Sequence, residues 1–137
     1  NIRLTRFGHT VIPLTTAGRE LLEPLLTLND QDLMFVIGFF DVSPALRFVL
    51  EYAKEAGCPV ILLTDTLGSV VGDYANVVLA ARRGPMSAFH SLVIPMTIIN
   101  TLLLSLSSAD EENVMASLDK LDQLRDRLKR IDHSTAS

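Results

Sequence analysis

An unbroken apolar run at residues 33–40, Leu-Met-Phe-Val-Ile-Gly-Phe-Phe, constrains the fold of this chain more than any other feature. The run does not alternate apolar and polar residues and is too short for most helices, so it predicts a parallel strand buried on both faces. Ser43 and Pro44 come next, and this pair favours a helix start because the serine hydroxyl can cap free backbone N–H groups. Apolar residues then recur at helical spacing as far as Gly57, which suits a left-handed helix end. A loop between such a strand and such a helix is where open α/β sheets bind anionic ligands.

Short apolar segments and helical patterns alternate along the rest of the chain. We expect strands near 10–14, 33–40, 60–64 and 76–80 and helices near 17–28, 44–56, 88–106 and 111–130. Pro13 places the first of these strands at a sheet edge, because proline cannot donate to a ladder. Alternation at this spacing is typical of βαβ units, which need a parallel sheet with right-handed crossovers. The predicted fold class is therefore α/β, a doubly wound three-layer sandwich with a parallel sheet.

Composition and charge limit the classes of function. With 137 residues, 48% of them hydrophobic and 20% charged, the chain is long and apolar enough for one folded domain. The 12 basic and 16 acidic residues give a net charge of −4 without a long basic run, so we do not expect this chain itself to bind nucleic acid. We expect a cytoplasmic protein, because the first residues do not form a signal peptide, the apolar window 92–106 is short for a membrane span, and the single cysteine fits a reducing compartment. Histidine, cysteine and carboxylate residues do not show metal-ligand spacing, so we expect no metal and no cofactor.

The last third of the chain predicts two helices with much apolar surface. The helix at 88–106 is apolar nearly all round, and the helix at 111–130 carries an apolar stripe. The stripe consists of Val114, Leu118, Leu121, Leu124, Leu128 and Ile131. One small sheet cannot cover this surface, so we expect a homodimer or higher oligomer, with 111–130 as a C-terminal packing and dimerisation helix. Packing of the two helices on each other is the alternative.

Three strings in this order resemble the sugar isomerase (SIS) domain, and most closely the effector half of RpiR-type transcriptional regulators. The segment 32–40 followed by 53–57 resembles the family's aspartate, apolar strand, phosphate loop and Ala-Lys-x-x-Gly. The segments 60–65 and 69–79 resemble its strand ending in Thr-Asp and the Ser-Pro-Leu-Ala-x-x-Ala-Asp-x-x-Leu that follows. Arg6-Phe7-Gly8 resembles its Arg-x-Gly. The resemblance covers residues 4–106 and implies a single SIS-like sugar-phosphate-binding domain over residues 1–137.

Two departures from the family pattern bear on function. The segment 38–43 keeps only the last hydroxyl of the family's Ser-x-Ser-Gly-x-Thr or Ser loop, and Asp41 adds a negative charge that an arginine or another cation would have to compensate. The family's first strand, with its Gly-x-Gly-x-Ser segment, and a regulator's helix-turn-helix have no counterpart in these residues. We therefore expect a SIS-like sheet that lacks the first strand.

The candidate site residues lie at the ends of the predicted strands. Ser43 at a helix N-terminus can bind phosphate or simply cap the helix. Thr64 and Ser69 border the next loop and can face the same crevice, although plain turn residues look the same. His90 matches the place of the family's acid/base histidine, and its alternative is a histidine bonded to nearby backbone. The expected ligand-binding residues are Ser43, Thr64, Ser69, Ser87 and His90, with His90 as the one candidate catalytic residue.

Charged residues beside these positions have plainer interpretations. Asp65 is interpreted as a turn former, and Arg82 and Arg83 as a solvated loop pair that can also neutralise a phosphate. Cys58 is interpreted as a small buried hydrophobic residue.

The resemblance implies a sugar-phosphate-sensing effector domain of an RpiR-type transcriptional regulator. DNA would be bound only through a separate N-terminal helix-turn-helix. A degenerate SIS dimerisation or interaction module is the second hypothesis, favoured by Asp41 and by the missing serines. An aldose-ketose isomerase is the third, because it needs a positioned base and the sequence near His90 contains no identifiable glutamate to assist it.

Overall fold

The computed structural model describes residues 2–15, 18–39, 41–84 and 90–135, with side chains described as far as residue 131. The chain forms two compact units. The sheet unit is Leu14–Ile98, and the helical unit consists of Asn1–Pro13 and Ile99–Ser137. Helix α4 (Val93–Ala109) begins in the sheet unit and ends in the helical unit.

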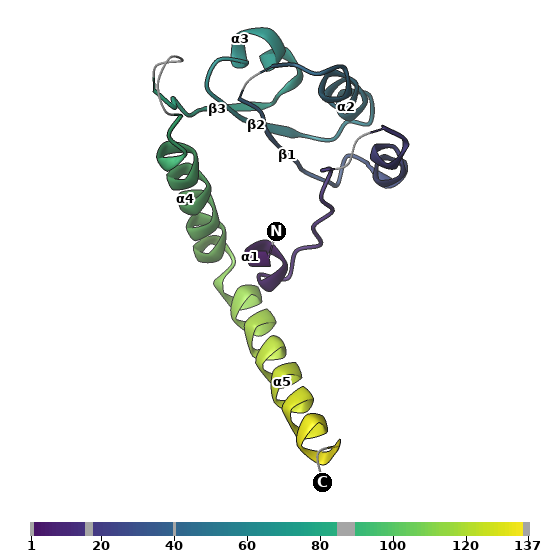
Figure 1. Ribbon diagram of the computed structural model, residues 1–137, viewed down its shortest axis with the longest axis vertical. Coiled ribbons are helices and arrows are strands. Elements are labelled where there is room, and N and C mark those ends of the chain that lie inside the picture. Colours follow the sequence, from purple (N-terminus) through teal and green to yellow (C-terminus); the bar gives the residue numbers. More distant parts are fainter. Residues whose placement is uncertain (1, 16–17, 40, 85–89, 136–137) are drawn as a thin grey trace. The chain divides into compact units, whose positions relative to one another are not determined.

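The sheet unit is built on a parallel sheet with the strand order β1-β2-β3 (Figure 1). Its strands are β1 (Met34–Ile37), β2 (Val60–Thr64) and β3 (Val77–Ala80). The connection from β1 to β2 contains α2 (Pro44–Glu55), and that from β2 to β3 contains α3 (Gly68–Val71) and the 3-10 helix η3 (Gly72–Tyr74). Met34 pairs with Val60 and Ile61 with Val77, both in parallel register. The predicted α/β class with a parallel sheet is confirmed.

Helix α2 begins and ends where its sequence predicts. Ser43 has extended backbone, and its Oγ accepts a hydrogen bond from the N–H of Leu46 at 3.1 Å. Pro44 is the first helical residue. Gly57 follows the helix with a φ of +72°, in the left-handed region that strains other residues. Local chemistry therefore accounts for both ends of this helix.

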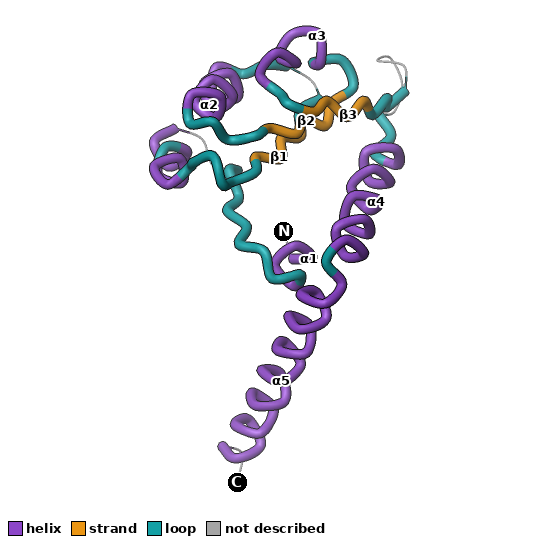
Figure 2. The backbone as a smooth tube through the Cα atoms, turned by 180° about the vertical axis from the view of Figure 1, so that it is seen from behind, coloured by secondary structure: helices purple, strands orange, loops and turns teal. Residues whose placement is uncertain are grey.

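The core of the sheet unit lies between the sheet and α2, which is on the same side of the sheet as α3 (Figures 1 and 2). Completely buried residues of this core are Leu50, Ala53, Val60, Leu62 and Val71. On the other face of β1, Phe35 and Ile37 are 39% and 52% exposed. The prediction of a strand buried on both faces is therefore wrong, because α2 packs on the face that carries Met34.

The predicted strand at 10–14 is also wrong. Residues 9–15, all of which the structure describes, have no regular secondary structure. A strand needs a neighbour for its ladder, and within the described residues β1 pairs with β2 alone. Pro13 in addition removes a backbone donor. Apolar composition was therefore not sufficient for a strand here.

The predicted helix at 17–28 consists of two short 3-10 helices, η1 (Gly18–Leu21) and η2 (Glu23–Thr27). Pro24 explains the break, because it has no N–H and its ring would collide with the carbonyl four residues earlier in an α-helix. Leu21 and Leu25 still reach the core, whereas Leu22 and Leu26, which helical spacing would put on the same face, are 46% and 82% exposed. The predicted helix at 88–106 begins only at Val93, and residues 85–89 lie outside the described part of the chain.

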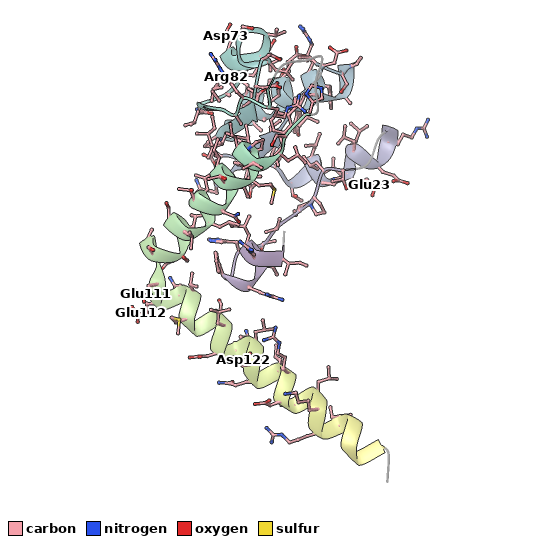
Figure 3. The ribbon with its side chains drawn as sticks, turned by 60° about the vertical axis from the view of Figure 1, so that its left-hand side comes forward. Glu23, Asp73, Arg82, Glu111, Glu112 and Asp122 are labelled. Carbon is pink, nitrogen blue, oxygen red and sulfur yellow. The ribbon has the colours of Figure 1, made fainter. Side chains whose placement is uncertain are left out.

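The helical unit contains α1 (Ile2–Arg6), most of α4, and α5 (Glu111–Thr135). Helix α1 contacts α5. Gly8 follows α1 with a φ of +90°, and a Cβ added there would lie 2.6 Å from Ser117 Oγ. Glycine at residue 8 therefore permits the close approach of α1 to α5. Glu111 and Glu112, labelled in Figure 3, lie in the first turn of α5, where the helix dipole favours negative charge.

Among the six described residues of the apolar stripe on α5, three are exposed, two are half-buried and one is buried. Val114 is buried, whereas Leu124, Leu128 and Ile131 are exposed. The homo-oligomer predicted from this stripe stays a prediction. Among the described residues, no single helix combines the length and apolarity needed to cross a membrane, while α4 and Glu111–Ile131 pass that test only together, as a bent pair.

Candidate functional site

Three loops leave the carboxyl ends of the parallel strands at one edge of the sheet. They are the β1–α2 loop (38–43), the β2–α3 loop (65–67) and the segment after β3 (81–84). Gly38 donates its N–H to the carbonyl of Leu63 at 3.1 Å, and Ala81 donates to Thr64 at 2.7 Å, so the ladder extends into the loops. Ligands of open α/β sheets bind outside such strand ends. This edge is the candidate functional site.

Arg83 joins all three loops. Its Nε and Nη2 donate to Asp65 Oδ2 at 2.9 and 2.8 Å, and Nη2 also donates to the carbonyl of Phe39 at 3.0 Å. The guanidinium carbon lies 4.4 Å from the centre of the Phe39 ring. The Arg83 side chain is 4% exposed and that of Asp65 is 14% exposed. The interpretation of Arg83 as a solvated loop residue is therefore wrong, whereas Arg82 is exposed (Figure 3).

Asp65 is the counterion of this buried arginine. Burial by itself would raise the pKa of the Asp65 carboxyl, but hydrogen bonds from Arg83 and from the backbone N–H of Thr66 outweigh burial and lower it. Asp65 Oδ1 accepts that Thr66 N–H at 2.8 Å, so the carboxylate also bonds the backbone of its own loop. An ionised carboxylate that already accepts several hydrogen bonds is poorly suited to act as a base near neutral pH.

The predicted hydroxyl ligands lie around this edge, and each bonds a backbone group three residues away. Ser43 is exposed and caps α2. Thr64 is 1% exposed, and its Oγ1 accepts the N–H of Leu67 at 3.2 Å. Ser69 is exposed, and its Oγ donates to the carbonyl of Thr66 at 3.2 Å. The hydroxyls therefore support the loops, and phosphate binding by them stays a prediction.

Of the two remaining predicted residues, Ser87 lies outside the described part of the chain. His90 is half-buried and precedes α4. The N–H of its neighbour Ser91 donates to the carbonyl of Arg83 at 3.1 Å, which brings this segment to the end of β3. A role of His90 in ligand binding or proton transfer stays a prediction. Within the described residues, no group of three or more histidine, cysteine and acidic residues could hold a metal ion.

Comparison with known proteins identifies the family. The protein-family model of the SIS domain matches residues 4–105 of this chain. This chain belongs to the SIS domain family. The resemblance seen in the sequence, and the SIS-like fold that it implied, are thereby confirmed.

Two solved structures and one curated protein are similar to this SIS domain. The sugar isomerase domain of the RpiR transcription factor from Sphaerobacter thermophilus is 27% identical, with a TM-score of 0.78 over 89% of this chain and 68% of that one. N-acetylmuramic acid 6-phosphate etherase from Pseudothermotoga lettingae is 26% identical over 112 residues, which cover 75% of this chain but only 38% of that protein. A crystal structure of a hypothetical protein is 17% identical with a TM-score of 0.59, covers 85% of this chain and 66% of that one, and shows the fold alone. The chain thus spans well under half the length of its curated relative.

The β1–α2 loop of this SIS domain contains a carboxylate of its own. Asp41 Oδ1 accepts the N–H of Val42 at 2.7 Å. Backbone N–H groups of a loop before a helix are the donors that bind anions in α/β folds. Asp41 occupies one such donor and adds a negative charge, with which a phosphate at this loop would have to compete.

The sequence did not predict the contacts that join Phe39, Asp65 and Arg83 in this SIS domain. Asp65 had been interpreted as a turn former only, and Arg83 as solvated. One signal could have found the pair: Asp65 directly follows one predicted parallel strand, Arg83 lies three residues beyond the next, and the carboxyl ends of such strands meet at one edge. An arginine and an aspartate in those positions are therefore candidates for an ion pair across the edge.

Proposed function

We propose that this SIS domain is the sugar-phosphate-sensing effector domain of an RpiR-type transcriptional regulator. The observation that carries the proposal is the likeness, over 89% of the chain, to the sugar isomerase domain of an RpiR transcription factor. The etherase relative is named for a phosphorylated sugar, N-acetylmuramic acid 6-phosphate. A sensor needs N–H groups and hydroxyls for the phosphate but no positioned base, which suits an edge bordered by Ser43 and Ser69.

A thermal-shift series tests ligand binding. Melting temperatures are measured with N-acetylmuramic acid 6-phosphate, glucosamine 6-phosphate and glucose 6-phosphate, each against its unphosphorylated sugar and against inorganic phosphate. A sugar phosphate at 100 times its Kd stabilises the folded state by about 2.7 kcal/mol. We expect at least one phosphorylated sugar to raise the melting temperature and its unphosphorylated form to leave it unchanged.

Variants of Ser43 separate ligand binding from helix capping. Ser43→Ala removes the cap on α2, which costs about 1 kcal/mol, and is also expected to abolish the ligand-induced shift. Ser43→Asp keeps a capping carboxylate but repels phosphate, so it retains the ligand-free melting temperature and loses the shift. Asp41→Asn removes the competing charge and is expected to strengthen the shift.

The degenerate interaction module is the second candidate, and Asp41 favours it because its carboxylate takes up a loop N–H. Such a module does not respond to sugar phosphates in either the wild type or Asp41→Asn. Absence of any shift in both proteins overturns the sensor and supports the module.

In the proposed regulator the domain works in the cytoplasm and forms a homodimer through the exposed stripe of α5, while DNA is bound by a separate helix-turn-helix. Leu124→Glu with Leu128→Glu places two charges on the stripe and is expected to dissociate the dimer. Gln123→Glu, a change at an exposed polar position of the same helix, is the control. Sedimentation velocity at micromolar concentration measures the outcome, and a monomeric wild type contradicts this part of the proposal.

A further inference from the structure

We infer that Arg83 is a positioning residue for the β1–α2 loop, held in place by Asp65 and acting through the carbonyl of Phe39. The structural part of this inference concerns the loop itself, and its value for phosphate binding rests on the function proposed above. Arg83 follows β3, whereas the carbonyl that it binds follows β1, at the opposite edge of the three-stranded order. A single side chain therefore spans the ends of all three described strands.

The planar guanidinium makes this bridge possible. Nη2 donates to both Asp65 Oδ2 and the Phe39 carbonyl, at 2.8 and 3.0 Å, while Nε gives Asp65 a second bond. A lysine offers one point charge and cannot reproduce this fork. The Phe39 ring also covers the guanidinium at 4.4 Å. Movement of the β1–α2 loop away from the sheet would thus break a hydrogen bond and a ring contact together.

Burial explains why Arg83 keeps its contacts with Asp65 and Phe39. With 4% of its side chain exposed, Arg83 depends on Asp65 for its counterion, since an unpaired buried charge is strongly unfavourable. The Arg83 backbone is held as well, because its carbonyl accepts the N–H of Ser91. Arg83 therefore has little freedom to follow a moving loop, and the loop is held against a fixed point.

This arrangement prepares the loop for an anion. A carbonyl oxygen facing the crevice would repel a phosphate, and Arg83 engages the Phe39 oxygen before any ligand arrives. Ordering the loop in advance removes part of the entropic cost of binding.

Hydrogen–deuterium exchange tests the inference without a ligand. Exchange of the peptide 38–43 is measured in Arg83→Met, Arg83→Lys, the double variant Arg83→Met/Asp65→Asn, and the matched control Arg82→Met, whose arginine is adjacent but exposed. Loss of one hydrogen bond from a charged donor raises local opening by about ten- to a hundredfold. We expect such an increase in all three Arg83 variants and no change in Arg82→Met.

The double variant separates positioning from general stability. It removes both charges, so we expect its melting temperature to recover toward the wild-type value while peptide 38–43 still exchanges fast. Slow, wild-type exchange in the folded double variant and in Arg83→Lys overturns the inference. The wild type and Arg83→Lys are then titrated with N-acetylmuramic acid 6-phosphate and with inorganic phosphate. A half-saturating ligand concentration about tenfold or more higher for Arg83→Lys than for the wild type supports the link to binding. If the wild type binds none of the sugar phosphates of the thermal-shift series but the exchange pattern is as expected, the proposed function fails and the positioning of the loop stands.

Discussion

Replacing Thr64 with valine tests how the buried end of β2 is held. Thr64 is 1% exposed, and its Oγ1 accepts the N–H of Leu67, which is also buried. Valine has nearly the same shape but cannot accept a hydrogen bond, so the Leu67 N–H loses this partner inside the protein. Serine keeps the hydroxyl and loses only a buried methyl group.

The magnitudes follow from these contacts. A buried donor that loses its acceptor costs about 1–3 kcal/mol, and the added apolar group returns about 0.8 kcal/mol, so Thr64→Val is expected to lose up to about 2 kcal/mol. Thr64→Ser is expected to lose about 1 kcal/mol through the missing methyl group. Thr64→Ala lacks both features and is expected to lose roughly the sum of the two effects.

Urea unfolding followed by tyrosine fluorescence measures these losses in the sheet unit. The chain has no tryptophan, and its two tyrosines, Tyr52 and Tyr74, both lie in Leu14–Ile98. With a slope of about 1–3 kcal/mol per molar urea, the midpoint of Thr64→Val falls by up to about 2 M. A Thr64→Val protein as stable as the wild type, beside a destabilised Thr64→Ser, would show that burial of the methyl group and not the hydrogen bond holds this strand end.

Three further predictions concern other contacts. Arg83 lowers the folded-state pKa of Asp65, so this pair stabilises the fold above the unfolded-state pKa of about 4. That contribution is lost as the pH falls through the lower folded-state pKa. The free energy of unfolding in urea should therefore fall more steeply from pH 7 to pH 3 in the wild type than in Arg83→Met/Asp65→Asn. Gly8→Ala is expected to cost about 1–3 kcal/mol by circular dichroism at 222 nm, because of the left-handed backbone and the contact with Ser117, and Ser117→Ala in the same chain should recover only the contact part. Burial raises the pKa of the Cys58 thiol, so iodoacetamide should label it slowly in the native protein and rapidly in urea; fast native labelling would mean that the strand entrance opens.

Local sequence determined those parts of the fold that depend on interactions between residues close together in the chain. Ser43, Pro44 and Gly57 set both ends of α2 through a cap, a preset φ and a left-handed position, all within a few residues of the helix. The β-branched run at 60–64 formed β2 as predicted, and the order of strands and helices indicated the parallel sheet and the SIS family. Such features depend on interactions at short sequence separation, which a single sequence displays directly.

Only the tertiary structure decided which faces are covered and which side chains meet. Residues 10–14 have a strand-like composition but no neighbouring strand within the described residues, and Phe35 is exposed because α2 packs on the other face of β1. Asp65 and Arg83 are 18 positions apart, and Phe39 is 44 from Arg83, so no local period relates them. Their contact exists because the register of the sheet brings three strand ends to one level, where a buried guanidinium needs a counterion and an acceptor.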